Sequence, residues 1–151
     1  MTLRAEPARP HDLRGALDLL GRAELTDQDV SKGWGHYFVV REDDGRVVGV
    51  AGLEVHGEDG LLRSVVVDLE YRGQGLAKAL VEAALERAQR VGLRSVYLLT
   101  TTAGDYFARH GFAGCPRDKA PPAIQESWEF RAGCPSSAAF MMRAVAQAPR
   151  G

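Results

Sequence analysis

The chain has 151 residues, of which 45% are hydrophobic and 26% charged, and 19 basic side chains nearly balance 20 acidic ones. This composition predicts an ordinary globular domain and excludes a disordered chain. A net charge of −1 gives no bulk attraction to nucleic acid or to an anionic membrane, so we expect neither as a partner. Two cysteines are too few for a disulfide framework, and no Cys/His spacing indicates a metal site.

The N-terminal residues predict no signal peptide, and no segment of the chain predicts a membrane span. No apolar run follows the N-terminal residues, and no stretch approaches the roughly 18 apolar residues that span a bilayer. We therefore expect a cytoplasmic protein with a single domain over residues 3–146 and a loose C-terminal tail over 147–151.

The N-terminal half predicts one clear helix among four strands. Asp12 is placed to cap a helix whose apolar residues recur at helical spacing up to Leu20. Residues 21–35 are polar and irregular, with room for one short helix. Val65-Val66-Val67 is apolar on both faces, which predicts a central, buried strand. The expected strands are 3–6, 37–40, 47–55 and 61–67, with turn signals at 43–45 and 57–60 between the last three.

The C-terminal half contains the strongest helix pattern of the chain, over residues 75–91, and Gly92 is a typical helix terminator. Four prolines interrupt the segment 115–135, where a helix over 122–130 is expected. The other expected elements are a strand at 95–101, a helix at 103–110 and a closing strand at 138–142. This order predicts a mixed α/β fold with a partly antiparallel sheet.

The segment from Val65 to Ala77 joins a buried strand to the long helix through Gly73 and Gly75. Glycines let the unpaired N–H groups of a first helical turn approach an anion, so a phosphate is the natural ligand. The segment lacks the Gly-Lys-Ser/Thr of a Walker A loop. A dinucleotide fingerprint fits poorly, because Lys78 stands where a third glycine is needed. A plain strand-to-helix turn without a ligand remains the alternative.

Two motifs identify a family resemblance. Arg72-Gly73-Gln74-Gly75-Leu76-Ala77 resembles the Arg/Gln-x-x-Gly-x-Gly/Ala signature of the GNAT superfamily of N-acetyltransferases. Residues 103–112, a short helical stretch ending in Gly111-Phe112, resemble its companion motif. The resemblance implies a mixed, mainly antiparallel sheet flanked by helices, with splayed central strands, and acetyl-CoA as cosubstrate.

Narrower resemblances suggest a substrate. Residues 52–54, 62–67 and 97–103 look like the branch that contains amino-acid N-acetyltransferases, and residues 115–138 look like bacterial arsenic-resistance N-acetyltransferases. They imply acetylation of the amine of a small amino-acid-like substrate, in resistance to arsenic or another toxicant. A non-catalytic acyl-CoA sensor and a protein N-acetyltransferase are the alternatives, and a homodimer is left open.

The resemblance also implies how acetyl-CoA binds, between the strands 61–67 and 95–101. Backbone groups of the first strand pair with the pantetheine arm, and the N–H of Val65 or Val66 stabilises the oxyanion. The N–H groups that open the helix hold the pyrophosphate, and the Arg72 side chain adds a charged contact. The cofactor-binding residues are thus expected to be Val65, Val66, Val67, Arg72, Gly73, Gln74, Gly75, Leu76 and Ala77.

The general acid is where this chain departs from the family. Many relatives carry a tyrosine four residues before the glycine of the companion motif, and this chain has Phe107 there. Tyr106 is adjacent, but neighbours on a helix point about 100° apart. Tyr106 is the candidate acid if the helix is rotated, and otherwise an ordinary half-buried aromatic, with water taking the role or with weak activity.

Four further sets of residues complete the predicted site. Glu54, which lies between apolar neighbours, is the candidate base, and the alternative is that it is an ordinary solvated glutamate of the strand. His56 lies on the same face of the strand. Arg63, a charged residue in an apolar strand, is the candidate group that binds a substrate carboxylate. The alternative is that Arg63 forms a structural ion pair, with Glu54 as the candidate partner. Cys115 and Cys134 are candidate soft ligands for a trivalent arsenical, and the alternative is that both are inert thiols.

Arg117 and Lys119 are candidates to add positive charge at the mouth of the cleft. The alternative is that both lie on a solvated surface without a role in binding.

Overall fold

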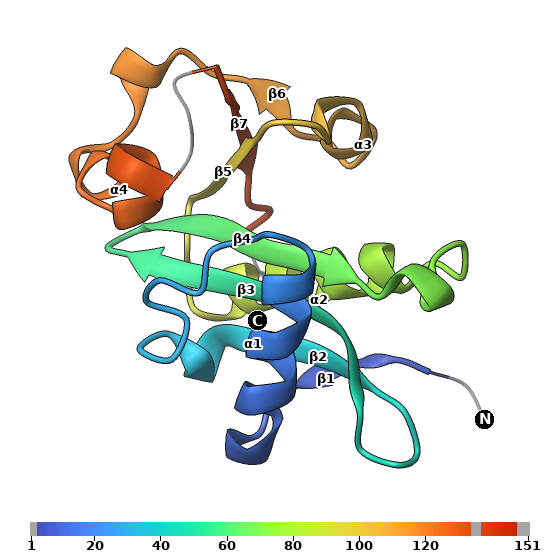
Figure 1. Ribbon diagram of the computed structural model, residues 1–151. Helices are drawn as coiled ribbons and strands as arrows, with labels where there is room; N and C mark the ends of the chain where they lie inside the picture. The colour runs from blue at the N-terminus through green and yellow to red at the C-terminus, as the bar shows by residue number, and fades with distance from the viewer. Residues whose placement is uncertain (1–2, 134–136, 148–151) are drawn as a thin grey trace. The chain divides into compact units, whose positions relative to one another are not determined.

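The computed structural model describes residues 3–133 and 137–147 (Figure 1). They group into two compact units. The first comprises the chain up to Glu54 together with Leu62–Arg87, and the second comprises Val55–Leu61 together with the chain from Ala88 onward. Strands β3 and β4 and helix α2 each contribute residues to both units, so each unit is described separately. The single domain over 3–146 stays a prediction, and residues 148–151 of the expected tail lie outside the described part.

Seven strands form one hydrogen-bonded sheet in the order β1-β2-β3-β4-β5-β7-β6. β4 pairs with β5 in parallel over three residue pairs, from Asp59 with Ser95 to Leu61 with Tyr97, although β4 has nine residues. The pairs β1–β2, β2–β3, β5–β7 and β6–β7 are antiparallel. The expected mixed, mainly antiparallel sheet is thus confirmed. The strands are β1 Ala5–Pro7, β2 Tyr37–Arg41, β3 Val47–His56, β4 Asp59–Val67, β5 Ser95–Thr100, β6 Ala113–Gly114 and β7 Ala139–Ala144.

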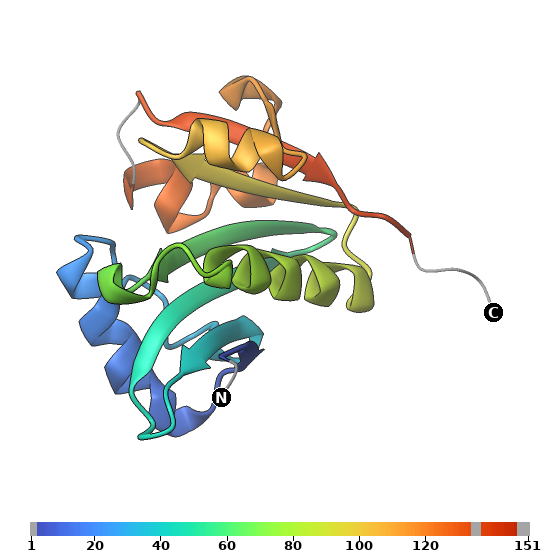
Figure 2. The ribbon, with the colours of Figure 1, turned by 90° about the vertical axis from the view of Figure 1, so that its right-hand side faces the viewer.

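In the first unit, two helices cover opposite faces of β2 and β3 (Figures 1 and 2). Helix α1, Leu13–Arg22, packs its apolar side into a cluster that contains Val39 and Val50. Helix α2, Leu76–Arg90, lies on the other face, where the Leu80 side chain approaches Gly49 so closely that a Cβ there would lie 3.0 Å from it. Alternate strand residues thus bury against different helices, as the period of two requires.

The N-terminal segment differs from the expectation at two points. The first strand is Ala5–Pro7, not 3–6, and Asp12 does not cap α1 with its side chain. Asp12 instead ends a 3-10 turn, Pro10–Asp12, and accepts a hydrogen bond from the Arg9 N–H at 2.8 Å. Its carboxylate is buried and pairs with Arg41 Nε at 3.0 Å, because an interior carboxylate requires a charged partner. The short helix expected within 21–35 is the 3-10 turn Trp34–His36.

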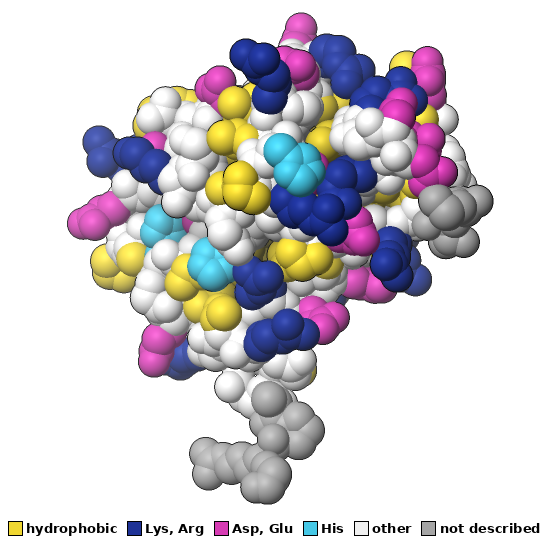
Figure 3. All heavy atoms as spheres, turned by 90° about the horizontal axis from the view of Figure 1, so that it is seen from below, with side chains coloured by type: hydrophobic (Ala, Val, Ile, Leu, Met, Phe, Trp, Pro, Cys, Tyr) yellow, Lys and Arg dark blue, Asp and Glu magenta, His cyan; other side chains and the backbone are white. Residues whose placement is uncertain are grey.

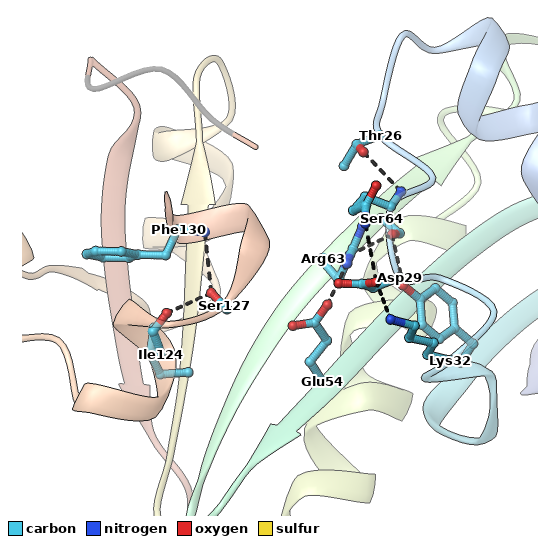
Figure 4. Close-up of polar contacts among 11 residues, drawn as sticks. Thr26, Asp29, Lys32, Glu54, Arg63, Ser64, Ile124, Ser127 and Phe130 are labelled. Carbon is cyan, nitrogen blue, oxygen red and sulfur yellow. Dashed lines mark hydrogen bonds and ion pairs between the residues drawn. The ribbon is translucent and has the colours of Figure 1, made fainter. Parts of the chain in front are cut away.

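In the second unit, β5 and β7 carry an apolar cluster that includes Tyr97, Ile124 and Phe140. The helix expected over 122–130 is divided into α4, Pro122–Gln125, and a π-helical turn, Glu129–Gly133. The Ser127 side chain accounts for the break, because its hydroxyl donates to the Ile124 carbonyl at 2.7 Å and accepts from the Phe130 N–H at 3.3 Å (Figure 4). The remaining elements are α3, Gly104–Arg109, and a 3-10 turn, Arg117–Lys119; the two-residue strand β6 was not expected.

The molecular surface in Figure 3 shows basic and acidic side chains interspersed among hydrophobic ones on the face drawn there, in keeping with the near-zero net charge. Within residues 3–133 and 137–147, no helix is both long and apolar enough to cross a bilayer. The same residues contain no cluster of three or more histidine, cysteine or acidic side chains suited to hold a metal ion.

Candidate functional site

The strand that leads into the predicted cofactor segment contains an unusual backbone conformation. Ser64 has a φ of 60°, although it is not glycine and lies inside β4. A left-handed residue of this kind costs about 1–2 kcal/mol and persists only where its surroundings hold it. Immediately after it, Val65 is half-buried, while Val66 and Val67 are 8% and 7% exposed. The left-handed conformation of Ser64 therefore changes the local direction of the backbone just before Val65–Val67. That this backbone binds a ligand stays a prediction.

The turn between β4 and α2 is held in place by Asp68. The Asp68 carboxylate accepts a hydrogen bond from the Glu70 N–H at 3.2 Å and pairs with Arg22 Nη1 at 3.2 Å. The Glu70 hydrogen bond and the Arg22 charge lower the pKa of the Asp68 carboxyl below its usual range. At the other side of the turn, Arg72 Nε donates to the Val67 carbonyl at 3.2 Å, so the side chain folds back along the strand end.

The glycines of the turn have the conformation that their residue type suggests. Gly73 and Gly75 have φ values of 82° and 77°, which other residues adopt only with strain. All four residues from Arg72 to Gly75 are exposed, and no neighbouring atom lies within 4 Å of where a Cβ at either glycine would be. The glycines are therefore needed for backbone conformation, and the space beside them is open to a ligand.

The start of helix α2 is the predicted anion site, made of backbone N–H groups. It runs for 15 residues from Leu76, and Ala79 N–H donates to the Gly75 carbonyl at 3.1 Å as the helix begins. The preceding N–H groups point out of the helix start, where the dipole carries partial positive charge. Exposed glycines at a helix start permit close approach of an anion, and binding of a pyrophosphate here stays a prediction.

The predicted base and the predicted substrate anchor are in direct contact. Arg63 Nη1 lies 2.5 Å from Glu54 Oε2, and the two side chains are 1% and 15% exposed (Figure 4). Arg63 Nε also donates to Ser64 Oγ at 3.3 Å. The ion pair foreseen as the alternative role of Arg63 is therefore present.

Two residues of this cluster were not singled out in the sequence. Tyr37 Oη lies 3.1 Å from Ser64 Oγ, in a hydrogen bond that either hydroxyl can donate. The Tyr37 ring covers Gly52, where a Cβ would lie 2.2 Å from the ring carbon that bears the hydroxyl. A glycine inside an apolar strand does signal close approach by another group. The sequence does not say which group approaches, so this signal alone identifies neither Tyr37 nor Ser64.

Helix α3, in the second unit, carries the two aromatic residues considered for the acid. Phe107 is buried and packs edge-on against Phe112, with ring centroids 5.8 Å apart. Tyr106 is half-buried, and its ring lies 4.6 Å from the His110 ring and 5.9 Å from the Arg109 guanidinium carbon. The two neighbours thus have different surroundings, as their spacing on a helix requires. Whether the Tyr106 hydroxyl moves a proton stays a prediction.

The C-terminal candidates differ in their contacts. Arg117 donates to the Ala138 carbonyl at 3.0 Å and lies over the Phe130 ring, so it is not merely solvated. Lys119 is exposed. The Cys115 thiol is half-buried and lies 3.6 Å from the Pro116 carbonyl oxygen. Cys134, the second cysteine of the arsenical hypothesis, lies outside the described residues.

Comparison with known proteins connects this geometry to a family. The family model described as the Acetyltransferase (GNAT) family matches residues 5–112, most of the chain, including the glycine turn and helix α3. An amino-acid acetyltransferase of Aeromonas salmonicida is 29% identical over 127 residues, which are 82% of this chain and 27% of that protein. The chain therefore spans about a quarter of the length of this relative.

Solved structures share the fold. N-acetylglutamate synthase from Neisseria gonorrhoeae, complexed with coenzyme A and N-acetyl-glutamate, superimposes with a TM-score of 0.84 at 17% identity, over 97% of this chain and 36% of that one. A Mycobacterium tuberculosis protein in complex with CoA gives 0.79 at 22% identity, over 94% and 99%. The expected fold class is confirmed by these neighbours, and from the match over residues 5–112 the chain belongs to the acetyltransferase (GNAT) family.

Proposed function

We propose that this protein is an acetyl-CoA-dependent N-acetyltransferase that acts on the amine of a small, amino-acid-like substrate. The observation that carries the proposal is the turn at Gly73 and Gly75, which adopts left-handed backbone at the start of helix α2, inside the segment matched to the family. Coenzyme A bound to two solved structures of the same fold supports the choice of cosubstrate.

The backbone N–H groups from Gly73 to Ala77 would hold the pyrophosphate, with Arg72 as a charged neighbour. The open space beside both glycines and the exposure of the turn are consistent with that assignment. Acetyl-CoA supplies an acetyl group activated as a thioester. The N–H of Val65 or Val66 is proposed to stabilise the oxyanion that forms when the amine attacks.

The amine must lose a proton before it attacks, because an alkylamine with a pKa near 10 is mostly protonated at neutral pH. Glu54 is the proposed base, directly or through a water. Its carboxylate lies 2.5 Å from Arg63 Nη1, so the proposed base and the proposed substrate anchor are direct neighbours. The leaving thiolate is proposed to take its proton from water, with Tyr106 as the alternative.

Arg63 is proposed to bind the carboxylate of the substrate. A guanidinium presents its N–H donors in a planar arrangement that matches a carboxylate, and the contacts of Arg63 to Glu54 and Ser64 place it in the same cluster as the proposed base. The amino-acid acetyltransferase relative and the N-acetyl-glutamate in the N. gonorrhoeae complex support an amino acid as the substrate class.

Resistance to arsenic, a homodimer and a cytoplasmic location remain proposals from the sequence alone. Growth of an arsenic-sensitive strain on arsenite, with and without this chain, tests the first.

The deciding experiment incubates the protein with acetyl-CoA and a panel of free amino acids, their carboxamides and an unstructured peptide, and follows release of free thiol. Turnover of free amino acids over their amides supports the proposal. Binding of coenzyme A by calorimetry without turnover of any amine favours the sensor, and turnover of the peptide alone favours a protein N-acetyltransferase. Failure to bind coenzyme A contradicts all three.

A further inference from the structure

Ser64 is the residue of β4 whose conformation needs an explanation. Its φ of 60° is unfavourable for a side chain with a Cβ, so neighbouring groups must stabilise it. Its hydroxyl contacts Tyr37 Oη at 3.1 Å and Arg63 Nε at 3.3 Å. Ser64 Oγ therefore connects a residue of β2 to the guanidinium of its own sequence neighbour.

The Tyr37 side chain is buried and closely packed on both sides of its ring. It is 1% exposed, its ring lies on Gly52, and the Trp34 ring stacks on it with centroids 5.1 Å apart. Gly52 faces Tyr37 directly in the β2–β3 register, so a side chain at 52 would displace the ring. Packing of the ring thus fixes the position of the Tyr37 hydroxyl, which in turn contacts the Ser64 side chain.

These contacts form one chain of polar groups, from Tyr37 through Ser64 and Arg63 to Glu54. Arg63 is fixed at Nε by Ser64 Oγ and at Nη1 by Glu54 Oε2 (Figure 4). Because the guanidinium is planar, contacts on different nitrogens restrict its rotation. Ser64 and Glu54 are therefore two of the groups that restrict the orientation of the Arg63 guanidinium.

We propose that Tyr37 and Ser64 are positioning residues, which orient the Arg63 guanidinium for the carboxylate of the amine substrate. The proposal rests on the proposed function for its substrate, and on the geometry of the cluster for its mechanism. Tyr37 and Ser64 need not touch the substrate. They act by lowering the number of orientations that Arg63 samples, which favours binding because less freedom is lost.

Three single variants separate orientation from backbone strain. Tyr37→Phe removes one hydroxyl and keeps the ring. Ser64→Gly removes the other and relieves the left-handed strain, whereas Ser64→Ala removes it and keeps the strain. All three are expected to raise KM for the amine about three- to tenfold, the worth of one hydrogen bond, and to leave KM for acetyl-CoA and kcat within about twofold. If Ser64→Gly matches the unmodified protein, only the backbone conformation matters and the proposal fails.

A double-variant test asks whether the hydroxyls act through Arg63. In the Arg63→Met background, adding Tyr37→Phe is expected to raise KM for the amine by less than about twofold, because nothing is left to orient. A full additional three- to tenfold rise would show that Tyr37 acts independently of Arg63. Ser127→Ala is the matched control, since it removes a buried, hydrogen-bonded hydroxyl elsewhere and should leave both KM values unchanged.

An NMR readout keeps the proposal testable whatever the enzyme turns over. The Arg63 Nε–H signal of the free protein, assigned by its loss in Arg63→Met, is expected to shift and to exchange faster with water in Tyr37→Phe and Ser64→Gly. An unmoved signal overturns the positioning role. A moved signal in a protein that acetylates no amine upholds the positioning and contradicts the proposed function instead.

Discussion

The glycine turn at residues 72–75 and the polar cluster around Arg63 are supplied by neighbouring stretches of chain, but they are built in different ways. The turn is exposed and offers backbone N–H groups, and its side chains make few contacts. The cluster is buried and depends on side chains from three strands, with Tyr37 on β2, Glu54 on β3 and Arg63 on β4. A backbone site needs only a local conformation, whereas a side-chain site needs partners that lie far apart in sequence.

The largest effect is expected from Gly75→Val, which tests the backbone site. Valine at a φ of 77° is strongly disfavoured, and its branched side chain would stand among the N–H groups proposed to bind the pyrophosphate. Affinity for coenzyme A should fall about a hundredfold or more, as measured by calorimetry. Gly45→Val is the control, because Gly45 has a φ of 89° in an open turn between β2 and β3. Equal loss of affinity in both variants would assign the effect to folding.

Next in size is Arg63→Met, which tests the side-chain site. Losing one charge-assisted contact should raise KM for the amine about ten- to a hundredfold and leave KM for acetyl-CoA nearly unchanged. The variant should also lose about 3 kcal/mol of stability, because one partner of a buried ion pair is removed.

The double variant Glu54→Gln/Arg63→Met separates the two roles of Arg63. Removing both charges should restore much of the lost stability in thermal melts without restoring affinity for the amine in calorimetry, a measurement that does not need turnover by the proposed base Glu54. Recovery of both together would make the ion pair structural and remove Arg63 from the substrate site.

A smaller effect on activity is expected from substitutions in helix α3, which belongs neither to the glycine turn nor to the cluster around Arg63. Tyr106→Phe should lower turnover less than about tenfold, and a loss of a hundredfold or more would make its hydroxyl the general acid. Phe107→Tyr should leave activity the same or raise it. The added hydroxyl enters a buried contact with Phe112, so a modest loss of melting temperature is expected beside it.

The smallest effect concerns pH. Burial, and then the charge of Arg87, lower the pKa of His36 from its usual 6.5, so the folded protein favours the neutral ring. The stability that depends on this is complete above about pH 6.5 and is lost as the pH falls through that value toward the lowered pKa. The melting temperature should therefore drop between pH 7.5 and 5.5, and less so in His36→Gln. Equal drops in both proteins would exclude His36 as the cause.

The parts of the site that follow from local conformation could be predicted from sequence. Glycine is the residue that adopts left-handed backbone without strain, so residue type alone was enough to place Gly73 and Gly75 at a helix start. The apolar pattern likewise located helix α2 and strand β4 to within two residues of their observed ends. The family motif then added a ligand that the pattern alone left open.

Hydrogen bonds of side chains to nearby backbone caused the local errors. Asp12 was expected to cap α1, but its carboxylate turns back to the Arg9 N–H and across to Arg41. Ser127 interrupts the expected helix over 122–130 by exchanging hydrogen bonds with the backbone on both sides of it. Both residue types compete with helical bonding, and local propensity does not say which bond prevails.

By itself, the sequence determined the fold class, the glycine-opened helix start and the presence of a charge at Arg63 that required a partner. Only the tertiary structure decided that Glu54 is a partner of Arg63, and that Tyr37 reaches Ser64 across the space left by Gly52. The left-handed backbone of Ser64 had no local signal either, because serine rarely adopts it without neighbours that hold it there. Local rules select the conformation of glycines, while buried polar contacts depend on which distant residues the completed sheet brings together.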